Sequence, residues 1–160
     1  MAWSTKKLAL IALVGVLLVA LYVFLPLLTT PQPTLPLATV TLASPSGPVR
    51  VSAEVADDPV ERSRGLAFRE SLAEGAAMLF VWPDEGVRSI WMRDTRFPLD
   101  VLFIGADLTV VHIVEGLQPC EADPCPLFDS GAPAQYALEV NADFVRRHGI
   151  RVGALVTIET

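Results

Sequence analysis

Lysine is almost missing from this chain of 160 residues. Lys6 and Lys7 are the only lysines, and every other basic residue is an arginine. Eighteen acidic residues outnumber twelve basic ones, which gives a formal net charge of −6, and all of the acids follow the first 30 residues. Nucleic-acid binding relies on an excess of positive charge that neutralises phosphates. The composition therefore argues against a nucleic-acid partner.

Histidine and cysteine are also scarce. The chain has two histidines, His112 and His148, and two cysteines, Cys120 and Cys125. These residues do not have the spacing of a zinc site, and no glycine-rich phosphate loop or dinucleotide fingerprint occurs. The sequence thus predicts neither a bound metal nor a cofactor. The cysteines lie close together in PCEADPCP, and we predict a disulfide between them in a domain outside the reducing cytosol.

One long apolar run, Leu8 to Leu28, carries no charged residue. A helix needs roughly 20 apolar residues to cross a bilayer, so residues 8–28 are predicted to be a transmembrane signal anchor. Lys6 and Lys7 precede the run, and the positive-inside rule then places residues 1–7 in the cytoplasm and the following domain outside. A cleaved signal peptide is the alternative, and it would make the protein secreted. The run is longer than the apolar region of a typical signal peptide, which has about 7 to 15 residues, and this favours the anchor.

Residues 29–37 include three prolines and are predicted to form an extended stalk. Residues 38–160 then form one extracytoplasmic domain of ordinary size. Short runs rich in Val, Ile and Thr alternate there with turn residues, which indicates strands. The expected strands span 38–43, 49–55, 76–82, 87–92, 99–104, 108–115, 136–140 and 155–159, and the expected helices span 61–64 and 142–148. This order predicts a mainly β (α+β), mostly antiparallel, barrel-like domain with two short helices.

Two acidic residues occupy strand positions where a charge is unexpected. In LDVLFI, alternation places Asp100 on the same face as Leu102 and Ile104. In YALEVNA, Glu139 shares a face with Ala137. A buried carboxylate requires a partner, because burying an unpaired charge is costly. Asp100 and Glu139 are candidates for a catalytic pair. Hydrogen bonds that fix the turn around Pro98 are the alternative for Asp100, and a solvated strand position or an ion pair with arginine is the alternative for Glu139.

The segment IWMRDTRFPLD, residues 90–100, combines aromatic, apolar and charged residues. Alternation and the turn proline account for its apolar residues and its bend. They do not account for its concentration of charge. Paired charges beside aromatic residues suit the recognition of a small polar ligand through arginine forks. The expected pocket residues are Trp91, Arg93, Asp94, Arg96, Asp100 and Glu139.

Several ordered motifs resemble a known family. They are ERSRGLAFRESL, AAMLFVW, IWMRDTRFPLDVLFIGAD, YALEVNA and GIRVG, and together they span about residues 49–158. The series is similar to the prokaryotic family called domain of unknown function 192. The resemblance implies a small β-rich domain, frequently exported or membrane-associated, and implies no reaction. The positions that the family pattern marks are Arg62, Gly65, Leu66, Arg69, Met78, Phe80, Trp91, Met92, Thr95, Pro98, Leu99, Asp100 and Glu139; Asp94 and Ala67 depart from it.

Three functions remain open from the sequence. The leading expectation is a membrane-anchored, extracytoplasmic module that binds a small polar ligand or an envelope component. The second is a hydrolase or transferase that acts on an envelope glycan or peptide, with Asp100 and Glu139 as acid and base. The third is a purely structural role for the motif. The sequence does not decide whether the protein is an enzyme.

Overall fold

The computed structural model describes residues 13–15 and 34–160. The predicted anchor, stalk and cytoplasmic end lie largely outside these residues. Within the described residues, no helix is long and apolar enough to cross a membrane. Residues 35–160 form one compact unit. Its elements are β1 (Leu37–Leu42), β2 (Val49–Ala56), α2 (Pro59–Arg64), β3 (Ala76–Gly86), β4 (Ser89–Ile90), β5 (Leu99–Ile104), β6 (Val110–Leu117), β7 (Phe128–Asp129), β8 (Ala134–Asn141), α3 (Phe144–His148) and β9 (Val156–Glu159).

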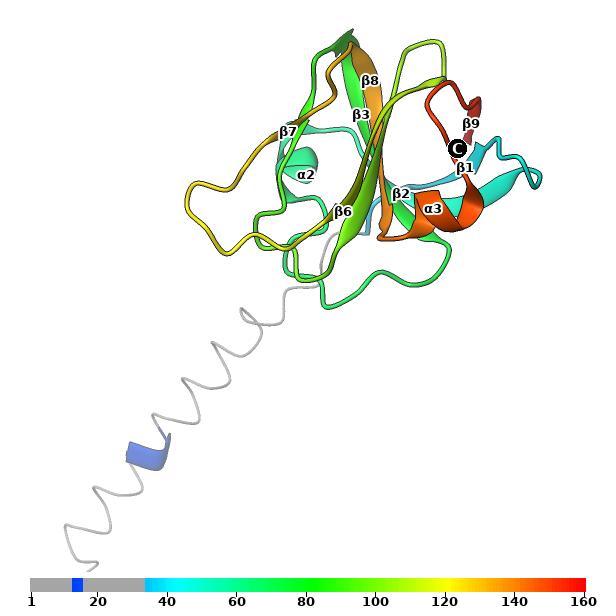
Figure 1. Ribbon diagram of the computed structural model, residues 1–160. Coiled ribbons are helices and arrows are strands. Elements are labelled where there is room, and N and C mark those ends of the chain that lie inside the picture. The colour runs from blue at the N-terminus through cyan, green and yellow to red at the C-terminus, as the bar shows by residue number, and fades with distance from the viewer. Residues whose placement is uncertain (1–12, 16–33) are drawn as a thin grey trace, which may run out of the picture. The chain divides into compact units, whose positions relative to one another are not determined.

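Seven strands form a mixed sheet in the order β6-β5-β8-β3-β2-β1-β9, and β4 pairs with β7 in a small second sheet. Strands β2 and β3 are parallel, whereas the other neighbours in the large sheet are antiparallel. The sheet curves into a half-barrel (Figure 1). Backbone hydrogen bonds from Val110 to Ala154 and from Val156 to Leu108 connect its two ends. The mainly β, barrel-like prediction is confirmed, and the parallel pair is a feature it lacked.

The sheet has a hydrophobic core on each face. One core contains Leu102, Ile104 and residues of α3, and the other contains Val101, Phe103 and Leu66, which follows α2. Figure 1 shows α2 and α3 on opposite sides of the central strands. Strand β5 is therefore buried on both faces along its whole length. A charged side chain on this strand or on its neighbour β8 must find its partners inside the protein.

Local sequence explains most element boundaries. Asp58 caps α2 by accepting hydrogen bonds from the backbone N–H groups of Val60 and Glu61, and the carboxylate of Glu61 accepts one from the backbone N–H of Asp58, which completes a capping box. Several boundaries differ from the prediction, most clearly those of β3 and β4, and β7 has no predicted counterpart. Strand β3 continues past Pro83 to Gly86 across an irregularity in its pairing with β8, and β4 is only two residues long. Tertiary pairing, which local propensity does not report, sets both lengths.

The cysteines form the predicted disulfide, Cys120–Cys125, with Cα atoms 5.9 Å apart. The bridge closes a short loop between β6 and β7. The backbone N–H of Cys120 donates to the carbonyl of Met92, and Arg93 makes a backbone bridge with Cys120. The disulfide loop is thus joined to the segment that follows β4.

Candidate functional site

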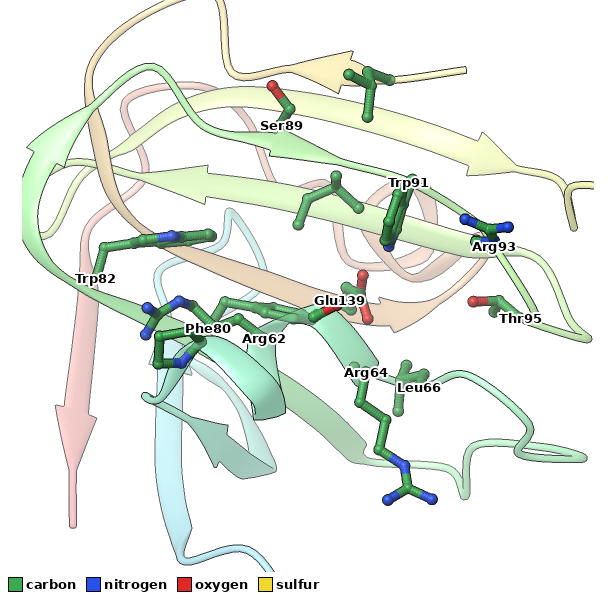
Figure 2. A pocket seen from close by; sticks show the side chains of 15 residues that line it. Arg62, Arg64, Leu66, Phe80, Trp82, Ser89, Trp91, Arg93, Thr95 and Glu139 are labelled. Carbon is green, nitrogen blue, oxygen red and sulfur yellow. The ribbon is translucent and has the colours of Figure 1, made fainter. Parts of the chain in front are cut away.

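A pocket of about 390 Å³ opens on the face of the sheet that carries α2 (Figure 2). Its walls come from four parts of the chain: the end of α2, strand β3, the segment from β4 to residue 95, and β8. Leu127, which precedes β7, adds one more side chain. The lining residues are Pro59, Arg62, Ser63, Arg64, Gly65, Leu66, Phe80, Trp82, Ser89, Ile90, Trp91, Arg93, Thr95, Leu127 and Glu139.

Gly65 allows the chain to turn from α2 into the pocket wall. It ends α2 with φ +47°, and its N–H donates to the carbonyl of Glu61. A Cβ at this position would stand 3.0 Å from the ring of Phe80. Positive φ and this close contact both favour glycine. The backbone of Gly65 therefore packs directly on Phe80, and the preceding arginines reach the pocket.

Glu139 is a buried acid that lines the pocket. It lies in the middle of β8, where its neighbours across the sheet are Met78 on β3 and Val101 on β5, and only 4% of the residue is exposed. Its Oε2 atom has no hydrogen-bond partner among the described residues. Burial raises the pKa of Glu139 to about 8, and the positive charge of Arg69 opposes only part of that rise. Near neutral pH the carboxyl group is mostly protonated and can donate a hydrogen bond.

Arg69 is already paired with another carboxylate. Its guanidinium donates to both carboxylate oxygens of Glu54, with Nη2 2.8 Å from Oε2. These hydrogen bonds lower the pKa of Glu54, so that carboxylate stays ionised. Strand register places Glu54 beside Met78 and Met78 beside Glu139, in one row across the sheet. Arg69 therefore stabilises Glu54, which leaves Glu139 without a full counter-charge.

Arginine side chains stack on the tryptophans of the pocket. The guanidinium of Arg62 lies 5.8 Å from the centre of the Trp82 ring, and that of Arg93 lies 5.7 Å from the centre of the Trp91 ring. Arg62 also donates to the carbonyl of Val81 at 2.8 Å. Stacking of this kind holds a guanidinium in place while its N–H edge stays free to bind. Within residues 34–160, Arg93 forms no ion pair with a carboxylate.

Three of the six predicted pocket residues line this pocket: Trp91, Arg93 and Glu139. Asp94 and Arg96 line shallower depressions nearby. The backbone of Asp94 is left-handed, with φ +57°, and its carbonyl accepts a hydrogen bond from Phe68. The side chain of Arg96 forms an exposed ion pair with Glu70. These two charges therefore belong to the surface around the pocket rather than to its lining.

The sixth predicted residue, Asp100, faces the other side of the sheet. Register pairs Asp100 with Val140 and Val101 with Glu139, so the two carboxyl groups point to opposite faces. Asp100 is fully buried, and it accepts hydrogen bonds from the backbone of Gly116 at 2.8 Å and of Val145 at 3.0 Å. The expected pocket that includes both acids is corrected here: Asp100 and Glu139 do not share a site. Asp100 joins β5 to β6 and to α3.

The sequence reading of the site omitted Arg62, Arg64, Trp82 and Thr95. Arg62, Arg64 and Trp82 lie outside residues 90–100, and only the fold brings them to the pocket, whereas Thr95 lies within that segment and was passed over because it carries no charge. One signal was available, because the family pattern marks Arg62, Gly65, Leu66, Phe80 and Thr95, all of which line the pocket. Marked positions that are scattered along a chain and belong to no single element indicate a shared site.

The two histidines and Ser130, which have reactive side chains, have structural surroundings. The rings of His112 and His148 pack against Phe103 and Phe144. Ser130 accepts a hydrogen bond from the backbone of Arg88 and donates to the carbonyl of Ala132, as a turn residue does. Among residues 13–15 and 34–160, no three His, Cys, Asp or Glu side chains are grouped so that they could hold a metal ion.

Comparison with known proteins identifies similar chains. The family DUF192, described as Uncharacterized ACR, matches residues 40–158. A solved structure from Sinorhizobium meliloti 1021, described as a proposed transcription regulator, is 34% identical with a TM-score of 0.73, over 79% of this chain and 97% of that one. A protein of unknown function from Novosphingobium aromaticivorans DSM 12444 is 30% identical with a TM-score of 0.74, over 80% of this chain and 89% of that one. Comparison with curated proteins finds no match.

Proposed function

The chain belongs to the uncharacterised family DUF192, and we propose that its domain is a binding module whose pocket takes up a small polar ligand. One observation carries this proposal: Glu139 is buried in the pocket wall with an oxygen that no described residue satisfies. An unsatisfied buried polar group costs about 1–3 kcal/mol of stability. A ligand that hydrogen-bonds to Glu139 would recover that free energy.

The size and composition of the pocket support the same proposal. About 390 Å³ lies within the range of pockets that bind small molecules. Aromatic and aliphatic walls alternate with a few polar groups, which is the usual composition of such sites. A purely structural role explains Glu139 less well, since a structural buried acid normally has hydrogen-bond partners, as Asp100 has.

A hydrolase or transferase with paired carboxyl groups has less support. That mechanism requires two carboxyl groups facing the same substrate. Asp100 and Glu139 point to opposite faces of the sheet. DNA binding, which the description of the Sinorhizobium protein suggests, also has less support in this chain. Helices α2 and α3 are only six and five residues long, and the net charge of −6 disfavours DNA.

We further propose that the domain acts outside the cytoplasm, anchored by residues 8–28. The support is the uncharged apolar run that follows Lys6 and Lys7. The Cys120–Cys125 disulfide adds to it, since disulfides persist in oxidising compartments. A fusion of a periplasmic-active reporter to the C-terminus tests this location. A full-length fusion whose reporter stays inactive would contradict it.

The binding proposal is tested by titrating the full-length chain with benzoate, phenyl phosphate, benzamide, benzylamine, glycine and N-acetylglucosamine. We expect at least one probe to shift the backbone NMR signals of pocket residues. Trp91→Ala should weaken that probe about tenfold, because aromatic side chains often dominate binding energy. Val152→Ala, at an exposed position outside the pocket, is the matched control. The proposal fails if every probe leaves the pocket signals unchanged at millimolar concentration.

A further inference from the structure

Hydrogen-bond donors gather at one end of the pocket. Figure 2 shows Arg93 and Thr95 toward one end of the view, Trp82 toward the other, and Glu139 between them. Thr95 is 8% exposed and carries a hydroxyl group. Glu139 in its protonated form adds an O–H, and Arg93 adds a guanidinium fork with no carboxylate partner in the described chain. All three groups can donate, and a ligand that meets them must supply acceptors.

The opposite end of the pocket is apolar and aromatic. Phe80 and Trp82 stack there with ring centres 6.2 Å apart, and the guanidinium of Arg62, which lies over Trp82, already donates to the carbonyl of Val81. The guanidinium of Arg88 lies 5.1 Å from the centre of the Trp82 ring and covers one of its faces. Arg88 also forms an ion pair with Asp84. This end offers contact area rather than hydrogen bonds. It suits the apolar body of a ligand.

The lining is positively charged, against the overall charge of the protein. Arg62, Arg64 and Arg93 all line the pocket, although the guanidinium of Arg64 points away from Glu139 (Figure 2), and Glu139 is the only acid among the described residues that line it. A cationic ligand would be repelled by this lining, whereas an anion would be attracted. Arginine forks match the planar geometry of carboxylates and the tetrahedral oxygens of phosphates.

We propose that the pocket selects small organic oxyanions, in which a carboxylate or phosphate group meets Arg93, Thr95 and Glu139 while an apolar body lies against Phe80 and Trp82. This inference rests on the proposed function and specifies its ligand class. The oxyanion supplies the acceptors that the donor end requires, and it supplies the counter-charge that Arg93 lacks. A hydrogen bond from the Glu139 carboxyl to the oxyanion satisfies the unpartnered oxygen.

The test compares benzoate and phenyl phosphate with benzamide, an uncharged analogue of benzoate, and with benzylamine, a cation. Calorimetric titration of the full-length chain near pH 6.5 should show both oxyanions binding about tenfold more tightly than benzamide, because charge-assisted hydrogen bonds are the stronger ones. Arg93→Ala should remove that preference. Arg146→Ala, which breaks only an exposed ion pair with Asp143, is the control and should keep it.

A pH series adds an independent readout. Benzoate binding should weaken as the pH rises past 8 in the wild type, since an ionised Glu139 repels the oxyanion, and should stay nearly constant in Glu139→Gln. The other charged groups around Glu139 are the arginines of the lining and the neighbouring ion pair: Arg62, Arg64, Arg93, Arg69 and Glu54. Arginines stay protonated throughout this range, and Glu54 stays ionised, so Glu139 is the group that titrates.

Three outcomes would overturn the inference. In the first, benzamide or benzylamine binds as tightly as benzoate. In the second, Arg93→Ala binds benzoate like the wild type while its thermal melt shows a folded protein. In the third, neither oxyanion binds while N-acetylglucosamine or glycine shifts the pocket signals, which would leave the binding function intact and refute only the ligand class. If no probe shifts the signals of the pocket residues, the proposed binding function is refuted as well.

Discussion

Replacing Glu139 with glutamine is expected to remove most of the alkaline loss of stability of this domain. Burial raises the pKa of Glu139 to about 8 in the folded protein, from an ordinary value of 4.5. Above pH 4.5 the unfolded chain gives up this proton more readily than the folded one, so folding stability falls as the pH rises and levels off above pH 8. At 1.36 kcal/mol per pKa unit, this single carboxyl group accounts for about 3 kcal/mol of lost stability between pH 6 and pH 9.

Urea unfolding of the wild type and of Glu139→Gln at pH 6, 7, 8 and 9 measures this effect. The free energy of unfolding should decline in the wild type by about 3 kcal/mol more than in the variant. The comparison concerns the slope with pH and not the absolute stability, because the buried amide changes hydrogen bonding at every pH. Glu115→Gln, at an exposed position on β6, is the control and should keep the wild-type slope. Parallel pH profiles for the wild type and Glu139→Gln would show that Glu139 ionises normally.

The unusual surroundings of Glu139 follow from how the strands are ordered. Alternation correctly predicted that Glu139 shares a face with Ala137, and that Asp100 shares one with Leu102 and Ile104. Alternation within each strand does not determine how two strands face each other. A shift of one residue in the register of β5 and β8 would place both acids on the same face. The observed register pairs Asp100 with Val140, and this single fact separates the two carboxyl groups.

In the fold, too, features whose partners lie close in sequence were predictable, whereas pairing between distant segments was not. The capping box at Asp58, the hairpin of β5 and β6, and the disulfide were predictable because their partners lie close together in sequence. The parallel pairing of β2 with β3 was not, because a connection that contains α2 permits either direction. The pocket depends on that pairing, since it positions the arginines of α2 over β3. The site could therefore be predicted only in the part that Trp91, Arg93 and Glu139 supply.

Asparagine in place of Asp100 is expected to destabilise the domain strongly without altering the pocket. Asp100 accepts hydrogen bonds from two buried or partly buried backbone N–H groups, those of Gly116 and Val145. An asparagine oxygen can accept only one of them, and its NH₂ group would face the other donor. Loss of a charge-assisted bond and one unsatisfied N–H together cost about 2–4 kcal/mol. For a domain of this size, such a loss lowers the melting temperature by on the order of 10 °C.

Thermal melts followed by circular dichroism measure this loss, with Asp143→Asn as the control. Asp143 precedes α3 and forms an exposed ion pair with Arg146, which contributes little to stability. Below the melting transition, Asp100→Asn should bind any pocket probe as the wild type does, because Asp100 faces the opposite core. If Asp100→Asn melts like the wild type but no longer binds the probe, Asp100 belongs to the binding site. Destabilisation with intact binding instead assigns it to the connection among β5, β6 and α3, and leaves Glu139 as the acid that meets a ligand.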